Sequence, residues 1–292
     1  MKVSDLLDHC EKNEWRSNRA QASLRSTLKT LHNHAGEYEV EDLDYRALCQ
    51  IKDALEAERR GKRPAAATVK RELSQLGAAL VVACKLGVIK AAPPMPSIAV
   101  QNTKDRVASA AEMQRIYGRI AERDGDRWWQ FGEMVRFVYD TACRRSEALM
   151  MRSDWLVEDA SGDLLIAWPQ FRDATAAERA RTGQSKVALL KNGKAKTLPA
   201  SAHFKTVRDR LEALSEDGRL FPFSETRAWE MWNEVCEDGL TLHTLRHTRI
   251  TNLIRSGAPL AAVSKLAGHS SIKITADRYG HLCVEDLKGI VA

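Results

Sequence analysis

The chain has 292 residues, of which 44% are hydrophobic, so it is long enough for one large domain or two ordinary ones with a sizeable core. Its 45 Lys and Arg residues exceed its 39 Asp and Glu residues, which gives a formal net charge of +6. This excess favours a polyanionic partner such as nucleic acid, without establishing one. The longest apolar runs are far too short to span a bilayer, which excludes a membrane-spanning class and predicts a cytoplasmic protein.

The first part of the chain predicts a small helical bundle, because residues 1 to about 90 show helical patterns and no strand alternation. One helix is expected between a cap at Ser17 and a stop at Gly36, and another ends at Gly87. Basic residues on these helices are candidate contacts to a phosphate backbone, and a solvated basic face is the alternative. They are Arg16, Arg19, Arg25, Lys29, Lys62, Arg63, Lys70 and Arg71.

A domain boundary is predicted in the stretch AAPPMPSIAVQNTKD, where three prolines in four positions exclude a helix. We expect a helical domain at 1–92, a linker at 93–105 and a second domain at 106–292. The second domain begins with helices, then changes period between Trp155 and Pro199, where short apolar runs and turn signals predict a small antiparallel sheet. Within that segment FRDATAAERARTGQ is either a loop or a short inserted helix. After Leu220 the pattern is helical again.

The six cysteines are scattered and form neither a CxxC pair nor a zinc-ligand spacing. We expect reduced thiols rather than disulfides or a metal site. These residues are Cys10, Cys49, Cys84, Cys143, Cys236 and Cys283.

The stretch HTLRHTRITNLIRSG places a charge where a core residue belongs. Arg246 lies four residues before Ile250 on the stripe that should face the core, and His243 shares its side of the helix. An inward Arg beside a His indicates either a structural ion pair or an anion site. His243 and His247 also have the i, i+4 spacing of zinc ligands, but the glutamate of an HExxH site and a third ligand are missing. A helix-turn-helix with SSIKITADRYG as recognition helix is a further alternative.

Two upstream features are weaker when taken singly. In TACRRSEALMM a turn delivers Arg144 to the start of a helix, where a bound anion is favoured, and Glu147 can hold its guanidinium. An exposed Arg–Glu helix pair is the alternative. In LLKNGKAKTLPAS, Lys191 lies at the tip of a predicted hairpin and by itself is only a turn lysine.

Taken in order, TACRRSE, a lysine in a β-turn, HTLRHT, and GH followed ten residues later by Tyr279 resemble the catalytic domain of the tyrosine recombinases, the phage integrase family. The resemblance covers residues 106–292, and the first half is similar to the SAM-like core-binding domain of that family. It implies a mainly α fold with a small antiparallel β-sheet, in which an N-terminal helical bundle precedes an α+β catalytic domain.

The resemblance also implies roles. Arg144 and Arg246 would bind the non-bridging oxygens of one DNA phosphate, and His269 would donate a hydrogen bond to it. Tyr279 would be the nucleophile. The remaining two residues would move protons: Lys191 would protonate the leaving 5′ oxygen, and His243 would assist proton removal from the tyrosine.

Two features depart from the family pattern. Ala142 stands where the family usually has Gly, which puts the turn before Arg144 in doubt. The polar insertion before the hairpin makes Lys194 and Lys186 alternatives to Lys191.

The implied activity is site-specific DNA recombination through a 3′-phosphotyrosyl intermediate, with a type IB topoisomerase-like strand transferase or a non-catalytic helix-turn-helix regulator as alternatives. The implied partners are double-stranded DNA with inverted-repeat core sites, a homotetramer assembled on that DNA, and accessory directionality proteins. We expect no cofactor, no metal and no membrane, and a protein close to the nucleoid of a bacterial or phage-infected cell. The tail 280–292 is expected to dock on a neighbouring protomer; packing on its own domain is the alternative.

Overall fold

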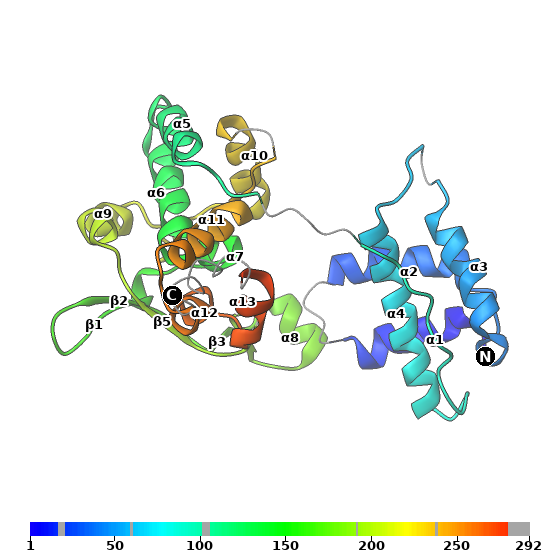
Figure 1. The fold of residues 1–292 in the computed structure, drawn as a ribbon. Helices are drawn as coiled ribbons and strands as arrows, with labels where there is room; N and C mark the ends of the chain where they lie inside the picture. The colour runs from blue at the N-terminus through cyan, green and yellow to red at the C-terminus, as the bar shows by residue number, and fades with distance from the viewer. Residues whose placement is uncertain (17–20, 59–60, 101–105, 191, 237–238, 280–292) are drawn as a thin grey trace, which may run out of the picture. The chain divides into compact units, whose positions relative to one another are not determined.

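The computed structural model describes residues 1–16, 21–58, 61–100, 106–190, 192–236 and 239–279 (Figure 1). Within these residues the chain forms two compact units. One comprises Met1–Thr103 with Thr175–Gln184, and the other comprises Lys104–Ala174 with Ser185–Ala292, as far as each is described. Of the residues singled out above, Ser17, Arg19, Lys191, Cys283 and the tail lie outside the described part. In that part no helix has both the length and the apolar character needed to cross a membrane.

The first unit is a bundle of helices around a core of leucine, valine and alanine side chains. Leu48, Ile51 and Leu55 recur at helical spacing and are fully buried. The inserted polar segment forms a short helix that groups with this unit, and Arg16 and Arg181 exchange side-chain-to-carbonyl hydrogen bonds there. The helices are α1 (Val3–His9), α2 (Gln21–Ala35), α3 (Tyr45–Glu56), α4 (Ala66–Lys85) and α8 (Ala176–Thr182).

The second unit is mostly helical and holds a larger core that joins helices to a small sheet. Phe131, Met134, Val135 and Val138 are all fully buried on one face of α6, as their spacing predicts. Its helices are α5 (Ala110–Ala121), α6 (Asp126–Thr141), α7 (Arg145–Leu149), α9 (Ala202–Ala213), α10 (Glu225–Val235), α11 (Leu242–Arg255), α12 (Leu260–Ala267) and α13 (Ile272–Tyr279).

The predicted antiparallel sheet is confirmed between residues 156 and 199. Strands β1 (Leu156–Glu158), β2 (Leu164–Trp168) and β5 (Lys196–Pro199) pair in the order β1-β2-β5, and β3 (Phe171–Asp173) pairs with β4 (Lys186–Ala188). The register places Trp168 opposite Lys196 and Ile166 opposite Leu198. Because side chains alternate between the faces of a strand, Lys196 and Leu198 both point to the buried side.

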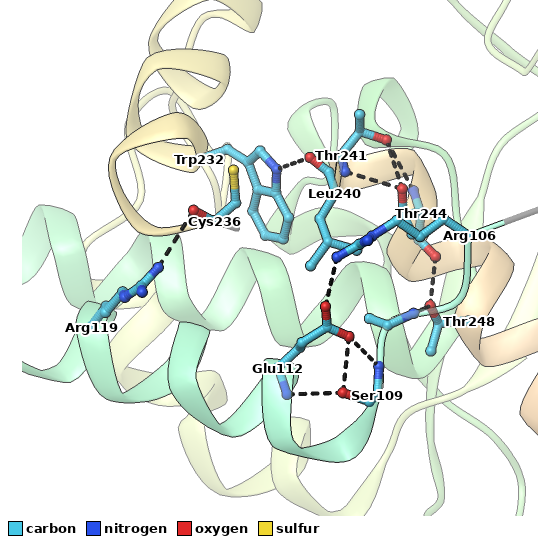
Figure 2. Close-up of polar contacts among 11 residues, drawn as sticks. Arg106, Ser109, Glu112, Arg119, Trp232, Cys236, Leu240, Thr241, Thr244 and Thr248 are labelled. Carbon is cyan, nitrogen blue, oxygen red and sulfur yellow. Dashed lines mark hydrogen bonds and ion pairs between the residues drawn. The ribbon is translucent and has the colours of Figure 1, made fainter. Parts of the chain in front are cut away.

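The start of α11 is held by a dense set of hydrogen bonds (Figure 2). The indole N–H of Trp232 donates to the carbonyl of Leu240 over 3.1 Å, which closes the loop before the helix. Thr241 caps the helix, since its hydroxyl accepts the backbone N–H of Thr244 over 3.2 Å. Satisfying these otherwise orphaned groups determines the residue at which the helix begins, and with it the direction of every side chain along α11.

A second contact ties the same helix to the start of α5. The hydroxyl of Thr248 donates to the Thr244 carbonyl over 2.8 Å and accepts the backbone N–H of Ala108 over 2.9 Å. Ser109 and Glu112 form a capping box at the start of α5, and Arg106 donates to Glu112 over 2.6 Å (Figure 2). These hydrogen bonds therefore fix the start of α5 relative to α11, independently of the side chains of the candidate site.

Candidate active site

Four segments of the second unit line one cavity of about 380 Å3, and one of them, between β4 and β5, contributes Asn192. The other three carry residues predicted from the sequence. The turn after α6 contributes Arg144, the first half of α11 contributes His243 and Arg246, and the α12–α13 region contributes His269 and Tyr279. All five were singled out from the sequence, and they come from positions up to 135 residues apart. The fold thus gathers two guanidinium groups, two imidazoles and one phenol from this set around a single space.

Arg246 is held by the backbone of the turn that carries Arg144. It is 4% exposed, and its Nη1 donates a hydrogen bond of 2.6 Å to the carbonyl of Ala142. Ala142 ends α6 in the left-handed conformation, with φ 49° and ψ 27°. Glycine adopts this conformation without steric strain, whereas other residues adopt it at a cost in free energy. The left-handed turn therefore forms with alanine present, and its carbonyl points at the guanidinium.

Arg144 is held by Glu147 in two ways. Its Nη1 donates to the Glu147 carboxylate over 2.6 Å, and its backbone N–H donates to the other carboxylate oxygen over 3.2 Å. Glu147 is 2% exposed, and its backbone carbonyl accepts the indole N–H of Trp168 over 3.2 Å. Because the buried carboxylate is anchored, it restricts the guanidinium to one orientation beside the cavity.

Lys196 adds a further cation, which no motif in the sequence indicates. Its ammonium group is buried, lies 3.7 Å from the second Glu147 oxygen and 4.9 Å from the centre of the Trp168 ring, and makes no hydrogen bond within the described residues. Burial lowers the pKa of this ammonium below its usual value, and Arg246 and Arg144 act in the same direction. Arg144 and Lys196 thus share the Glu147 carboxylate, and Arg246 lies close enough to feel both charges. An anion in the cavity would relieve the repulsion among these cations.

The imidazoles of His243 and His269 are neutral near pH 7. Burial, followed by the charges of Arg246 and Arg144, lowers the pKa of His269 to about 4, and burial with Arg246 lowers the pKa of His243. His269 Nδ1 lies 2.7 Å from the buried Thr275 hydroxyl. When Nδ1 accepts that hydroxyl proton, Nε2 carries the ring hydrogen and is a donor for an anion.

Tyr279 is buried at the end of α13, and its hydroxyl lies 2.5 Å from Nδ1 of His247. From the sequence, His247 is a candidate only for a zinc ligand, through its i, i+4 spacing from His243. Its ring lies edge-on to that of His243, with centroids 5.3 Å apart. Among the described residues no group of three or more His, Cys, Asp or Glu side chains is placed to hold a metal ion.

Residues 107–285 match the model of the phage integrase family. The chain belongs to the phage integrase family. A XerD tyrosine recombinase from Halalkalibacterium halodurans is 30% identical over 108 residues, 35% of this chain and 33% of that protein. A XerC-like tyrosine recombinase from Caldanaerobacter subterraneus is 52% identical over 40 residues, 14% of this chain and 10% of that protein. The matched stretches cover well under two thirds of either relative.

Solved structures of integrases share the fold of this family member. The Tn1549 transposon integrase in complex with transposon right end DNA matches with a TM-score of 0.75 at 15% identity, covering 100% of both chains. A lambda integrase dimer bound to a core site matches with a TM-score of 0.67 at 16% identity, covering 94% of this chain and 97% of that one. The predicted fold class is confirmed: mainly helical with a small antiparallel sheet.

The hairpin predicted around Lys191 does not form as expected, because β4 pairs with β3 and β5 pairs with β2 rather than with each other. Lys191 itself lies outside the described residues. Asn192 lines the cavity, and its amide donates to the carbonyl of Gly268 over 3.3 Å. The alternatives, Lys194 and Lys186, are both exposed, and neither lines the cavity. Lys191, which precedes Asn192 in the sequence, therefore remains the predicted lysine of the site.

Among the residues of the helical unit that the structure describes, the basic side chains are not gathered into a comparable network. Arg25 is paired with Glu11 over 3.1 Å and its side chain is 70% exposed, while Arg71 donates to the Ser23 hydroxyl over 3.4 Å. Arg63 donates to the carbonyl of Glu56 over 3.3 Å. Exposed side chains complete the described set: Arg16, Lys29, Lys62 and Lys70.

Proposed function

We propose that this phage integrase family member is a site-specific DNA recombinase that cuts and rejoins DNA through a 3′-phosphotyrosyl intermediate. The observation that carries the proposal is the single cavity onto which Arg144, His243, Arg246, His269 and Tyr279 converge. Two fixed guanidinium groups that line one cavity can bind the oxygens of a phosphodiester, and a phenol at the same cavity supplies a nucleophile. The family match and the fold of DNA-bound integrases support the same conclusion.

Arg144 and Arg246 bind the non-bridging oxygens of the phosphate that is attacked, and His269 donates to it through Nε2. Charge builds on these oxygens in the pentavalent transition state, and donors already held in place need no reorganisation to stabilise it. Glu147 and the Ala142 carbonyl hold the two guanidinium groups at 2.6 Å each. By analogy with oxyanion-hole donors, loss of one of them removes about 3–4 kcal/mol of transition-state stabilisation.

The strand transfer is a transesterification. The Tyr279 hydroxyl loses its proton with assistance from His243, attacks phosphorus, and joins the 3′ phosphate, while the bond to the 5′ oxygen breaks. Lys191 donates a proton to that leaving oxygen. A 5′ hydroxyl of the partner strand later reverses the attack. Because the phosphotyrosine keeps the energy of the broken bond, joining the strands needs no nucleotide cofactor.

The DNA substrate is a duplex with inverted-repeat core sites, bound by a homotetramer and regulated by accessory directionality proteins. The basic residues of the helical unit contact the phosphate backbone of the core site. Apolar residues of the tail, including Leu282, Leu287 and Ile290, dock on a neighbouring protomer. A chain ending at Gly280 should bind DNA and recombine poorly; unchanged recombination would contradict this role.

The proposal is tested on DNA that the protein itself selects. Duplexes retained from a random pool are nicked beside the bound centre, so that cleavage releases a short strand and traps the covalent product. The wild-type protein should form an adduct that resists SDS, and Tyr279→Phe should form none. No adduct from the wild-type protein would support a non-catalytic regulator, and cleavage without exchange between two sites would support a topoisomerase-like enzyme.

A further inference from the structure

We propose that His247 is a catalytic residue of the same site, which holds the Tyr279 hydroxyl and receives its proton when the tyrosine attacks the phosphate. The inference rests on the proposed strand transfer and adds to it a specific proton acceptor. It starts from the 2.5 Å contact between the Tyr279 oxygen and His247 Nδ1, the atoms that carry and accept the proton.

Both side chains are fixed by their surroundings. His247 is 7% exposed on α11, one residue after Arg246, and Tyr279 is 5% exposed at the end of α13. The Tyr279 ring belongs to an apolar cluster with Ile250, Val263 and Ala267, and its centroid lies 5.6 Å from that of the His247 ring. Since packing restricts both rings, the hydroxyl approaches Nδ1 in a defined orientation.

His247 and His243 occupy different positions around the nucleophile. Both histidines line the main cavity, but only His243 also lines a neighbouring one of about 400 Å3, and Arg144 lines both cavities with it. That arrangement places His243 beside the phosphate ligands. His247 contacts the phenol directly and contacts His243 edge-on through the rings. The acceptor is therefore His247, and His243 assists through the ring that it touches and through the phosphate.

The proton and electron balance is complete with the groups of the proposed strand transfer. In the tautomer with hydrogen on Nε2, Nδ1 accepts the phenolic hydrogen bond. During attack the O–H bond of Tyr279 breaks and an N–H bond forms on His247, while the Tyr279 oxygen bonds to phosphorus. The phosphorus–O5′ bond breaks, its electron pair stays on O5′, and Lys191 protonates that oxygen. When a 5′ hydroxyl reverses the attack, its proton passes to Lys191 as the new phosphorus–O5′ bond forms. The bond between phosphorus and the Tyr279 oxygen breaks, and His247 returns its proton to that oxygen.

The test separates removal of the proton from its delivery to the leaving group. The DNA substrate is the self-selected nicked duplex, prepared with either the natural 5′ oxygen or a bridging sulfur at the scissile position. A thiolate leaves without protonation, so the sulfur substrate should restore cleavage by Lys191→Ala. It should not restore His247→Asn or His247→Ala, because in these variants the nucleophile still lacks its acceptor.

Both His247 variants should form the adduct at least about a hundredfold more slowly than the wild-type protein in a single turnover, with DNA affinity unchanged. In His247→Asn the amide oxygen can still accept the phenolic hydrogen bond, although it cannot act as a base. This variant therefore decides the question if His247→Ala fails to fold. The matched control is His203→Asn, which removes a histidine on α9 that contacts Glu133 at 2.6 Å, and it should cleave as the wild-type protein does.

Cleavage by His247→Asn within about threefold of the wild-type rate would overturn the assignment, because loss of a general base costs about a hundredfold or more. Rescue of that variant by the sulfur substrate would also overturn it. Failure of the proposed function gives a different result: no adduct from the wild-type protein, or an equal adduct from Tyr279→Phe.

Discussion

The helical unit and the candidate active site use the same residue types in opposite ways. Arg25 in the helical unit is 70% exposed and pairs with one nearby carboxylate, whereas Arg246 is 4% exposed and bonds to a backbone carbonyl. An exposed cation attracts DNA through a long-range field that salt screens. A buried and oriented cation acts on one phosphate, and its geometry matters as much as its charge. The two regions should therefore respond differently to the same substitutions.

The largest difference is expected for Arg246→Lys. Lysine keeps the charge and loses the planar fork that bonds Ala142 on one side and reaches the cavity on the other. The single-turnover rate of adduct formation should fall by about a hundredfold to a thousandfold. Arg25→Lys is the matched control, and its rate should equal that of the wild-type protein. A similar loss in both variants would remove the distinction between the two regions.

Lys196→Met tests whether the buried ammonium serves function at a cost in stability. Burying a charge without hydrogen bonds is unfavourable, so the variant should be as stable as the wild-type protein or more stable in urea denaturation. Cleavage should nevertheless slow by about tenfold, equivalent to ~1.4 kcal/mol, because the positive charge close to Arg144 and Arg246 is reduced. A clear loss of stability with unchanged cleavage would make Lys196 a purely structural residue.

Substitution of the exposed lysines of the helical unit should weaken DNA binding without changing the rate of the cleavage reaction. Lys29→Ala and Lys70→Ala should each remove one phosphate contact. Each variant should therefore lower the slope of log affinity against log salt concentration by about one. The cleavage rate at saturating DNA should stay unchanged. Fluorescence anisotropy across a salt series measures the slope. A variant that changes the rate and leaves the slope intact would contradict the assignment of these residues to backbone contacts.

The pH dependence of stability should show a smaller effect that belongs to the active site alone. Burial lowers the pKa of His269 in the folded protein to about 4, below the usual value of 6.5. Between these two values the unfolded chain binds the proton and the folded one does not, so stability rises with pH across this window. From pH 6.5 to pH 4 the wild-type protein should therefore lose more stability than His269→Asn. Thermal unfolding of both proteins across this pH range measures the loss. An equal loss of stability in the wild-type protein and in His269→Asn would contradict a neutral buried imidazole.

The sequence predicted the elements and the residue types of the site better than their contacts. Helical spacing placed Phe131 and Met134 in the core, and the sheet was correctly located, because both patterns depend on local periodicity. Lys196 was missed although Leu198 shares its face of β5, since the alternation that buries the leucine also buries the lysine. His247 lies in the HTLRHT motif, but its contact with Tyr279 depends on how α13 packs against α11, which no local pattern encodes. The grouping of α8 with the helical unit is likewise a tertiary property.

The most direct measurement of the central claim is a peptide map of the covalent product. Wild-type protein trapped on its nicked duplex is digested with nuclease and protease, and the peptides are sequenced by mass spectrometry. The account predicts a 3′-linked nucleotide on the peptide that contains Tyr279, with no other tyrosine modified. A nucleotide attached to Tyr117, Tyr139 or any residue other than Tyr279 would contradict it.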